Sequence, residues 1–237
     1  MLILLVICAA LLWSGFSDLV KSVAAESVLT NYSFSAANFL IHPLPPSLAQ
    51  WEDRDNSGDY FDRIQPVKVG YLIWSDFPVK IYVEMPRNED KGGKVWFNGV
   101  VEAVKEWGVY LPLQVVETGE MADIKVLYKI PPLRVSAGNG IRARSAETRW
   151  SLYNKKLVTG KVILSHRFTI LLSPNQIPIY TKASARHEIG HALGIWGHSP
   201  LPTDALYFSQ VRNPPGISAR DINTLKKIYQ QPTQLGM

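Results

Sequence analysis

The chain has 237 residues, of which 46% are hydrophobic and 19% are charged, and its formal net charge is +5 at pH 7. This is the composition of a globular protein, and the length suits one catalytic domain with additional segments. The small excess of positive charge favours solubility and is no evidence for nucleic acid as a partner.

The N-terminal segment predicts export from the cytoplasm. Residues 2–16 are almost entirely apolar, and Val23-Ala24-Ala25 follows with the small residues that signal peptidase prefers. We therefore expect residues 1–25 to be a signal peptide and the protein to be secreted or extracytoplasmic. An uncleaved membrane anchor is the alternative, although the apolar run is shorter than the roughly 20 residues that a span needs. The single cysteine, Cys8, lies in this segment, so the rest of the chain has no thiol for a disulfide.

Residues 26–66 are expected to form a pro-segment or an N-terminal extension. They include the proline-rich stretch 42–46 and an acidic, turn-rich stretch. Residues 53–58 match the opening of a calcium loop, but Ile64 stands where such a loop needs a bidentate glutamate. A solvated turn is the better interpretation of that stretch.

The folded domain is expected to start near Val67, with strands and one long helix in its first half. Short runs of β-branched and apolar residues predict strands over residues 78–84, 113–117 and 122–128. Between the first two of these strands, apolar side chains recur at helical spacing: Trp96, Val100, Val104 and Trp107. This spacing predicts a helix that packs these side chains into the core and ends near Gly108.

Residues 134–167 are rich in Lys and Arg and contain one acidic residue, Glu147. We interpret this stretch mainly as a solvated loop region, with attraction of acidic substrates or an anionic surface as the alternative. The only histidine within it, His166, is expected to be structural. Arg167 to Leu172 then reads as a strong strand.

The most informative stretch is Ala185 to Ser199, with the sequence A-R-H-E-I-G-H-A-L-G-I-W-G-H-S. His187 and His191 are four residues apart, so on a helix they share a face with Cβ atoms about 5–6 Å apart. Two imidazoles at this separation can bind one zinc ion. Glu188 lies at the edge of the same face, where it can contact a water on the metal.

A third zinc ligand is predicted just beyond this helix. Gly194 can adopt a positive φ, end the helix and turn the chain back, which brings His198 toward the metal. Three protein ligands leave the fourth tetrahedral position for water, as a catalytic zinc requires. No glutamate follows Glu188, and the remaining carboxylate candidates are better interpreted as a turn residue, Asp204, and a helix cap, Asp221.

The pattern H-E-I-G-H-A-L-G…H-S resembles the zinc signature of the metzincin metallopeptidases, in particular of the matrixin branch. The family has two residues between the glycine and the third histidine, whereas this chain has Ile195, Trp196 and Gly197. The resemblance covers roughly residues 67–231 and leaves 232–237 as a tail. It implies an α+β, zincin-like catalytic domain, in which a twisted mixed sheet is joined by a long helix, an active-site helix and a C-terminal helix.

The resemblance also implies roles for three further segments. The strand at 167–172 would be the sheet edge that pairs with an extended substrate, with a plain core strand as the alternative. Leu206 stands where the family places a methionine beneath the zinc. Residues 217–229 are similar to the last helix of matrixin domains, with Ser218 as its cap. From the sequence itself, Ser184 or Thr181 is expected to cap the zinc helix.

These observations predict a secreted, monomeric zinc metalloendopeptidase that acts on proteins or peptides. His187, His191 and His198 would hold Zn²⁺, and Glu188 would be the general base for the attacking water. One alternative is a non-catalytic binding module stabilised by zinc, which the intact general base disfavours. Another is a membrane-tethered processing protease, which differs in location and not in chemistry.

Overall fold

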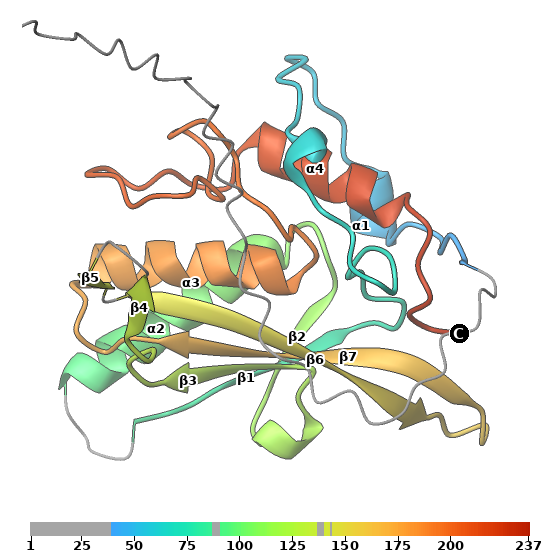
Figure 1. The fold of residues 1–237 in the computed structure, drawn as a ribbon, viewed down its shortest axis with the longest axis horizontal. Coiled ribbons are helices and arrows are strands. Elements are labelled where there is room, and N and C mark those ends of the chain that lie inside the picture. Colours follow the sequence, from blue (N-terminus) through green and yellow to red (C-terminus); the bar gives the residue numbers. More distant parts are fainter. Residues whose placement is uncertain (1–38, 87–90, 137–139, 143) are drawn as a thin grey trace, which may run out of the picture.

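The computed structural model describes residues 39–86, 91–136, 140–142 and 144–237, so the expected signal peptide, residues 1–25, lies outside the described residues. The fold is α+β, with a five-stranded mixed sheet and a separate two-stranded ribbon (Figure 1). In the described ranges, no helix has the length and apolar character needed to span a membrane. The elements in chain order are α1 (Pro46–Ala49), η1 (Phe61–Arg63), β1 (Val79–Val83), α2 (Lys91–Trp107), β2 (Leu113–Val116), η2 (Gly119–Met121), β3 (Ile124–Tyr128), β4 (Arg134–Ser136), β5 (Gly140–Arg142), β6 (Ala146–Lys156), β7 (Val162–Leu172), α3 (Pro178–Ala192) and α4 (Ala219–Tyr229).

The sheet has the order β2-β1-β3-β7-β6, and its first four strands are parallel to one another. Ile124 in β3 lies opposite Ile81 in β1 and Phe168 in β7, and all three side chains are buried. Parallel neighbours need a crossover connection, and α2 provides it between β1 and β2. The three short strands predicted in the first half of the domain are thereby confirmed.

The prediction that residues 167–172 form an edge strand is wrong. These residues belong to β7, which lies between β3 on one side and β6 on the other. The last three residues of β7 are all buried, as expected of a strand covered on both faces. The edge strand is β6, which pairs antiparallel with β7 along its whole length.

The stretch interpreted as a solvated loop region therefore contains a long strand. Strand β6 has 11 residues, and most of its side chains are exposed or half-buried. Charged side chains are common on edge strands because one face and one edge can stay in water and the charges discourage pairing with other chains. The Lys and Arg content of this stretch is thus compatible with a strand at the edge of a sheet.

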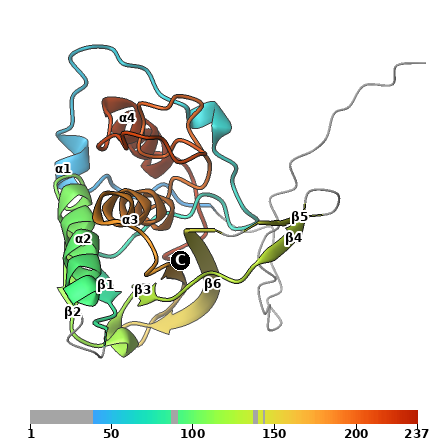
Figure 2. The same cartoon turned by 90° about the vertical axis from the view of Figure 1, so that its left-hand side faces the viewer.

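The helices lie in layers above the sheet. Helices α2 and α3 cover one face, and α3 lies between the sheet and α4 (Figures 1 and 2). The helical spacing predicted for α2 is confirmed, because its apolar positions are all buried: Trp96, Val100, Val104 and Trp107. The position of α3 at the centre of the domain explains why most of its second half is buried.

Residues before Val67 and after α4 also enter the core. Leu48, Tyr60 and Ile64 are buried in the same hydrophobic cluster as the sheet and helices. At the other end, Leu235 is 1% exposed and Thr233 is fully buried. Both ends of the described chain therefore contribute to one packed unit, while removal of residues 26–66 as a pro-segment stays a prediction.

Candidate metal centre

Helix α3 carries the first two histidines and begins earlier than a side-chain cap would place it. Its N-cap is Ile177, and Pro178 occupies the first helical position. The expected caps, Thr181 and Ser184, lie inside the helix, so that prediction is wrong. Proline suits the first position because its φ is already helical and it has no N–H to satisfy. The Ser184 hydroxyl instead donates to Gln176 Oε1 (2.9 Å).

Three buried hydrogen bonds fix α3 in place. The Trp107 indole N–H of α2 donates to the Arg186 carbonyl (2.8 Å), and the Trp74 indole N–H donates to that of Ala192 (2.9 Å). From α4, the Tyr229 hydroxyl donates to the Leu193 carbonyl (2.9 Å). The neighbouring elements thus hold both the start and the end of the histidine-bearing segment.

The chain turns back after α3 as predicted. Gly194 has φ of +128°, which is in the region that favours glycine, and the helix ends just before it. At Gly197 a Cβ would lie only 2.5 Å from the Arg63 carbonyl oxygen, so the loop needs a glycine to pass this segment.

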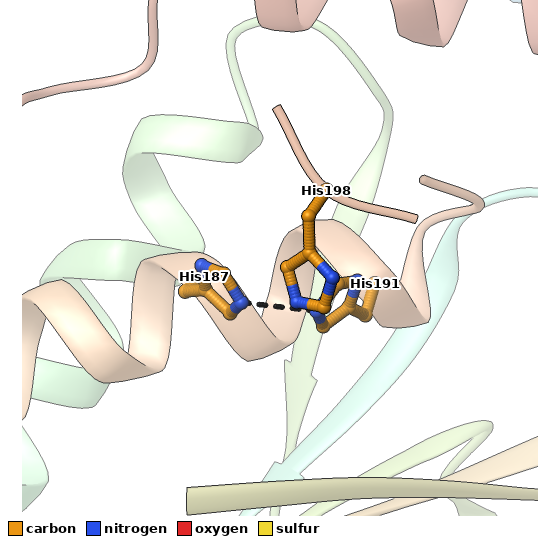
Figure 3. A group of neighbouring side chains, drawn as sticks. All are labelled: His187, His191 and His198. Carbon is orange, nitrogen blue, oxygen red and sulfur yellow. Dashed lines mark hydrogen bonds between the residues drawn. The ribbon is translucent and has the colours of Figure 1, made fainter. Parts of the chain in front are cut away.

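The turn brings the three predicted ligand residues together. His187 and His191 project from α3, and His198 reaches them from the following loop (Figure 3). One ring nitrogen from each residue lies within 4.8 Å of the others, and this is the one such group in the described chain. The rings of His191 and His198 are 4.8 Å apart and nearly perpendicular.

The hydrogen bonds of the two helical histidines leave their inner nitrogens free for a metal. His187 Nδ1 faces the Ala205 carbonyl (2.9 Å), and His191 Nδ1 faces the Ile195 carbonyl (2.7 Å). A carbonyl oxygen only accepts, so both Nδ1 atoms must carry the proton. In the neutral rings each Nε2 atom then presents a lone pair, and the two Nε2 atoms are 3.0 Å apart.

This geometry fits a metal ion between the rings. Two lone pairs that face each other at 3.0 Å repel, unless a cation or a proton lies between them. Zn–N bonds of about 2.0–2.1 Å at tetrahedral angles would separate the two nitrogens by about 3.3 Å, close to the observed distance. His187 and His191 therefore already have the spacing of a shared metal ion, and His198, whose nitrogen lies within 4.8 Å of theirs, would move closer to complete the site.

Two of the three imidazoles have a lowered pKa, which favours the neutral form that metals bind, although His198 is exposed in the structure and His191 is buried. The pKa of His191 is well below its ordinary value, mainly because of desolvation and also because His187 and His198 are near. Desolvation, with a smaller effect of His187, lowers the pKa of His198 to about 4. Both rings are thus deprotonated at neutral pH and ready to act as ligands.

Glu188 lies beside the histidines in a partly buried position. Burial raises the pKa of its carboxyl group, and this effect is partly opposed by His187 and by a hydrogen bond from Thr148. The Thr148 hydroxyl of β6 is 2.5 Å from Glu188 Oε2. Sequence analysis missed Thr148, because it is 40 residues away and no local motif marks it. Only the placement of β6 beside α3 reveals the contact.

Leu206, an apolar residue of the loop after α3, packs against that helix. Leu206 is fully buried, and a Cβ on Gly190 would lie 2.7 Å from Leu206 Cδ2. The turn that carries it is closed by a hydrogen bond from Ser199 N to the Leu206 carbonyl (2.8 Å). Leu206 thus packs against α3 at Gly190, which lies between the two helical histidines in the sequence.

The two aspartates considered as alternative ligands have other partners. Asp204 accepts hydrogen bonds from Ser199 Oγ (2.5 Å) and Arg220 Nε (3.1 Å). Asp221 forms a capping box with Ser218 at the start of α4, which confirms the predicted cap. It also accepts from Ala205 N (2.9 Å), and the Ala205 carbonyl accepts from the His187 ring. Asp221 therefore supports the backbone that orients the first histidine.

His166 lies outside the histidine cluster. Its side chain is 1% exposed and stacks on Trp74, with ring centroids 4.0 Å apart. Desolvation lowers its pKa to about 3. It is thus a neutral aromatic component of the core in strand β7, whereas the three grouped histidines lie on α3 and in the loop after it.

The chain was compared with models of protein families and with curated protein sequences. No model of a protein family matches the chain, and no curated protein sequence matches it. The interpretation of the metal centre therefore rests on the chain's own residues and their geometry.

Proposed function

We propose that the protein is a zinc-dependent metalloendopeptidase of the metzincin type, with His187, His191 and His198 as the metal ligands. The observation that carries this proposal is the convergence of three imidazoles, two from α3 and one from the loop after it, beside the carboxylate of Glu188 on α3. When bound, zinc supplies Lewis acidity, which makes water a nucleophile near neutral pH and polarises a carbonyl group.

Zinc is favoured over other ions by the ligand set and by the chemistry. Imidazole nitrogens suit zinc, copper, nickel and iron, whereas magnesium and calcium prefer oxygen ligands. Three histidines with one open position are a common arrangement in catalytic zinc sites. The adjacent carboxylate gives such a site a base for hydrolysis, which needs no change in the oxidation state of the metal.

Glu188 is proposed to move the proton in this reaction. Its carboxylate would accept a proton from the attacking water and pass it to the leaving amine. Burial raises the pKa of Glu188. A raised pKa helps a carboxylate in this role, because the group takes up a proton more readily. A non-catalytic binding module would have no need for this group.

The edge of β6 offers a place for the peptide to be cleaved. One side of β6 pairs with β7, and no other strand of the described chain pairs with its second side. An extended peptide could add to this free edge through main-chain hydrogen bonds, which tolerate many side chains. Thr148 of β6 contacts Glu188, so this edge runs past the proposed base. The proposed substrates are therefore proteins or peptides in extended form.

The location of the enzyme follows from the N-terminal segment. We propose secretion or release to an extracytoplasmic space as a monomer, with residues 1–25 removed. N-terminal sequencing of the mature protein tests this proposal, because a start at Glu26 excludes a membrane tether.

The function is tested by cleavage of a generic unfolded protein. We expect the zinc-loaded chain to cleave it, a chelator to abolish cleavage, and added zinc to restore it. The Glu188→Gln variant should lose at least about 100-fold in rate, because general-base catalysis contributes about 10²–10⁴-fold. A zinc-loaded chain without cleavage would contradict the proposal and favour the binding module. Equal activity in the variant would contradict the role of Glu188 as general base.

A further inference from the structure

We propose that Thr148 positions the carboxylate of Glu188 for proton transfer, an inference that rests on the proposed peptidase function. Thr148 Oγ1 is 2.5 Å from Glu188 Oε2 and 3.3 Å from the Glu188 carbonyl oxygen. A hydroxyl has a single proton, and the closer and charged partner is the better acceptor. The proton therefore points to Oε2.

Thr148 is well placed to hold a side chain still. It lies within β6, where it pairs with Ile170 of the central strand β7. A β-branched side chain has restricted χ1 rotation, and a paired strand fixes its backbone. The hydroxyl is thus a rigid donor that reaches across from the sheet to α3.

The contact with Thr148 gives the two carboxylate oxygens of Glu188 different roles. Oε2 is held by Thr148, whereas the described part of the chain provides no hydrogen bond to Oε1. A carboxylate anchored at one oxygen cannot rotate freely about its last side-chain bond, so Oε1 keeps one direction. In the proposed reaction, Oε1 is the atom that takes and returns the proton.

The same residue also links the base to the proposed substrate strand. Strand β6 is the free edge on which an extended peptide would pair, and its residue Thr148 holds the base. The position of the peptide and the position of the base are therefore set by one element. Thr148 acts through Glu188 and is a positioning residue.

The contact is first tested in the metal-free chain by a double-mutant cycle. Thr148→Val keeps the shape and removes the hydroxyl, and Glu188→Ala removes its partner. We expect Thr148→Val to lower the folding equilibrium constant about tenfold in the parent and less than threefold in the Glu188→Ala background. Equal effects in both backgrounds would overturn the contact, whatever the activity of the loaded enzyme.

The role is then tested by kinetics of the zinc-loaded chain. We expect Thr148→Val to lower kcat at least tenfold, with KM and zinc content unchanged, and Thr148→Ser to recover kcat to within about threefold of the parent. Thr159→Val, the same substitution at an exposed position in the turn after β6, is the matched control and should keep the parent kcat.

The outcomes separate the two proposals. A Thr148→Val kcat within twofold of the parent would overturn the positioning role while leaving the peptidase function intact. An equal loss in Thr148→Ser and Thr148→Val would also overturn it, since packing and not the hydroxyl would then matter. No cleavage by the parent would overturn the proposed function and, with it, the positioning role, although the cycle in the metal-free chain would still report the contact.

Discussion

Replacement of Asp221 by alanine should both destabilise the fold and weaken the metal centre. The carboxylate is fully buried and accepts hydrogen bonds from Tyr60 Oη (2.5 Å), Ala205 N (2.9 Å) and Ser218 N (2.8 Å). Alanine would leave all three donors without this acceptor. A buried donor without a partner costs about 1–3 kcal/mol, which gives about 3–9 kcal/mol for the three.

The net loss should be nearer the lower end of that range. Desolvation raises the pKa of Asp221 despite its hydrogen bonds, so the ionised form is itself costly to bury. Removing the carboxylate recovers part of that cost. We therefore expect Asp221→Ala to lower the free energy of unfolding by about 3–5 kcal/mol, a large share of the roughly 5–15 kcal/mol typical of a domain.

Asp221→Asn is the comparison for Asp221→Ala, because asparagine keeps one acceptor oxygen at this position. Ala205 N and Ser218 N both donate to Asp221 Oδ2, and the amide oxygen of asparagine can accept from them in its place. The NH₂ group of asparagine would then face the Tyr60 hydroxyl, which can turn to accept a hydrogen bond. We expect a loss of about 1 kcal/mol. Zinc affinity should fall about 10–100-fold in the alanine variant alone, because the Ala205 carbonyl that orients His187 would lose its support.

Denaturant unfolding of the metal-free chains and zinc titration of the folded ones measure these effects. A loss below 1 kcal/mol in Asp221→Ala would refute the role of the carboxylate as the acceptor of this cluster. Equal losses in the alanine and asparagine variants would refute the assignment of its hydrogen bonds. An unchanged zinc affinity in Asp221→Ala would refute the link through Ala205.

Two further predictions concern stability away from the ligands. Burial lowers the pKa of His166 to about 3, so unfolding takes up a proton below pH 6.5, and stability should be lost as the pH falls from 6.5 toward 3. His166→Phe keeps an aromatic ring, and in unfolding measurements it should reduce the pH dependence of the free energy of unfolding by about 1.4 kcal/mol per pH unit. An unchanged pH dependence would contradict a neutral buried ring. Gly197→Ala should lower the free energy of unfolding by about 1–3 kcal/mol, because its Cβ would press on the Arg63 carbonyl. Gly216→Ala, whose Cβ would meet no atom within 4 Å, should change the free energy of unfolding by less than about 1 kcal/mol. Comparable midpoints for the two glycine variants would speak against the close approach at Gly197.

The candidate site was predictable because its signal is local. The spacing of His187 and His191 fixes a shared helix face, and Gly194 marks the turn that returns His198. Each of these inferences involves residues only a few positions apart, where helix geometry and backbone sterics determine the result. The same holds for the capping box of Ser218 and Asp221 at the start of α4.

Features that depend on strand order were not predictable in the same way. The edge position of β6 and the central position of β7 follow from long-range pairing, which no local pattern specifies. The contact between Thr148 and Glu188 follows from that arrangement and was missed with it. The packing of Tyr60 against Asp221 likewise joins residues 161 positions apart. The start of α3 is a different case. Proline at a first helical position indicates a helix start, so Pro178 favoured the observed start over the polar caps that were expected.

We propose that three imidazoles of this chain hold one zinc ion. X-ray absorption spectroscopy at the zinc edge, on protein with its metal content determined, measures this ligand set. We predict one zinc per chain with three imidazole nitrogens at about 2.0–2.1 Å and one further light ligand. The Glu188→Gln variant should give the same ligand shell, and His191→Ala should lose the ion. No bound zinc, or a shell with fewer than three imidazoles, would contradict the claim.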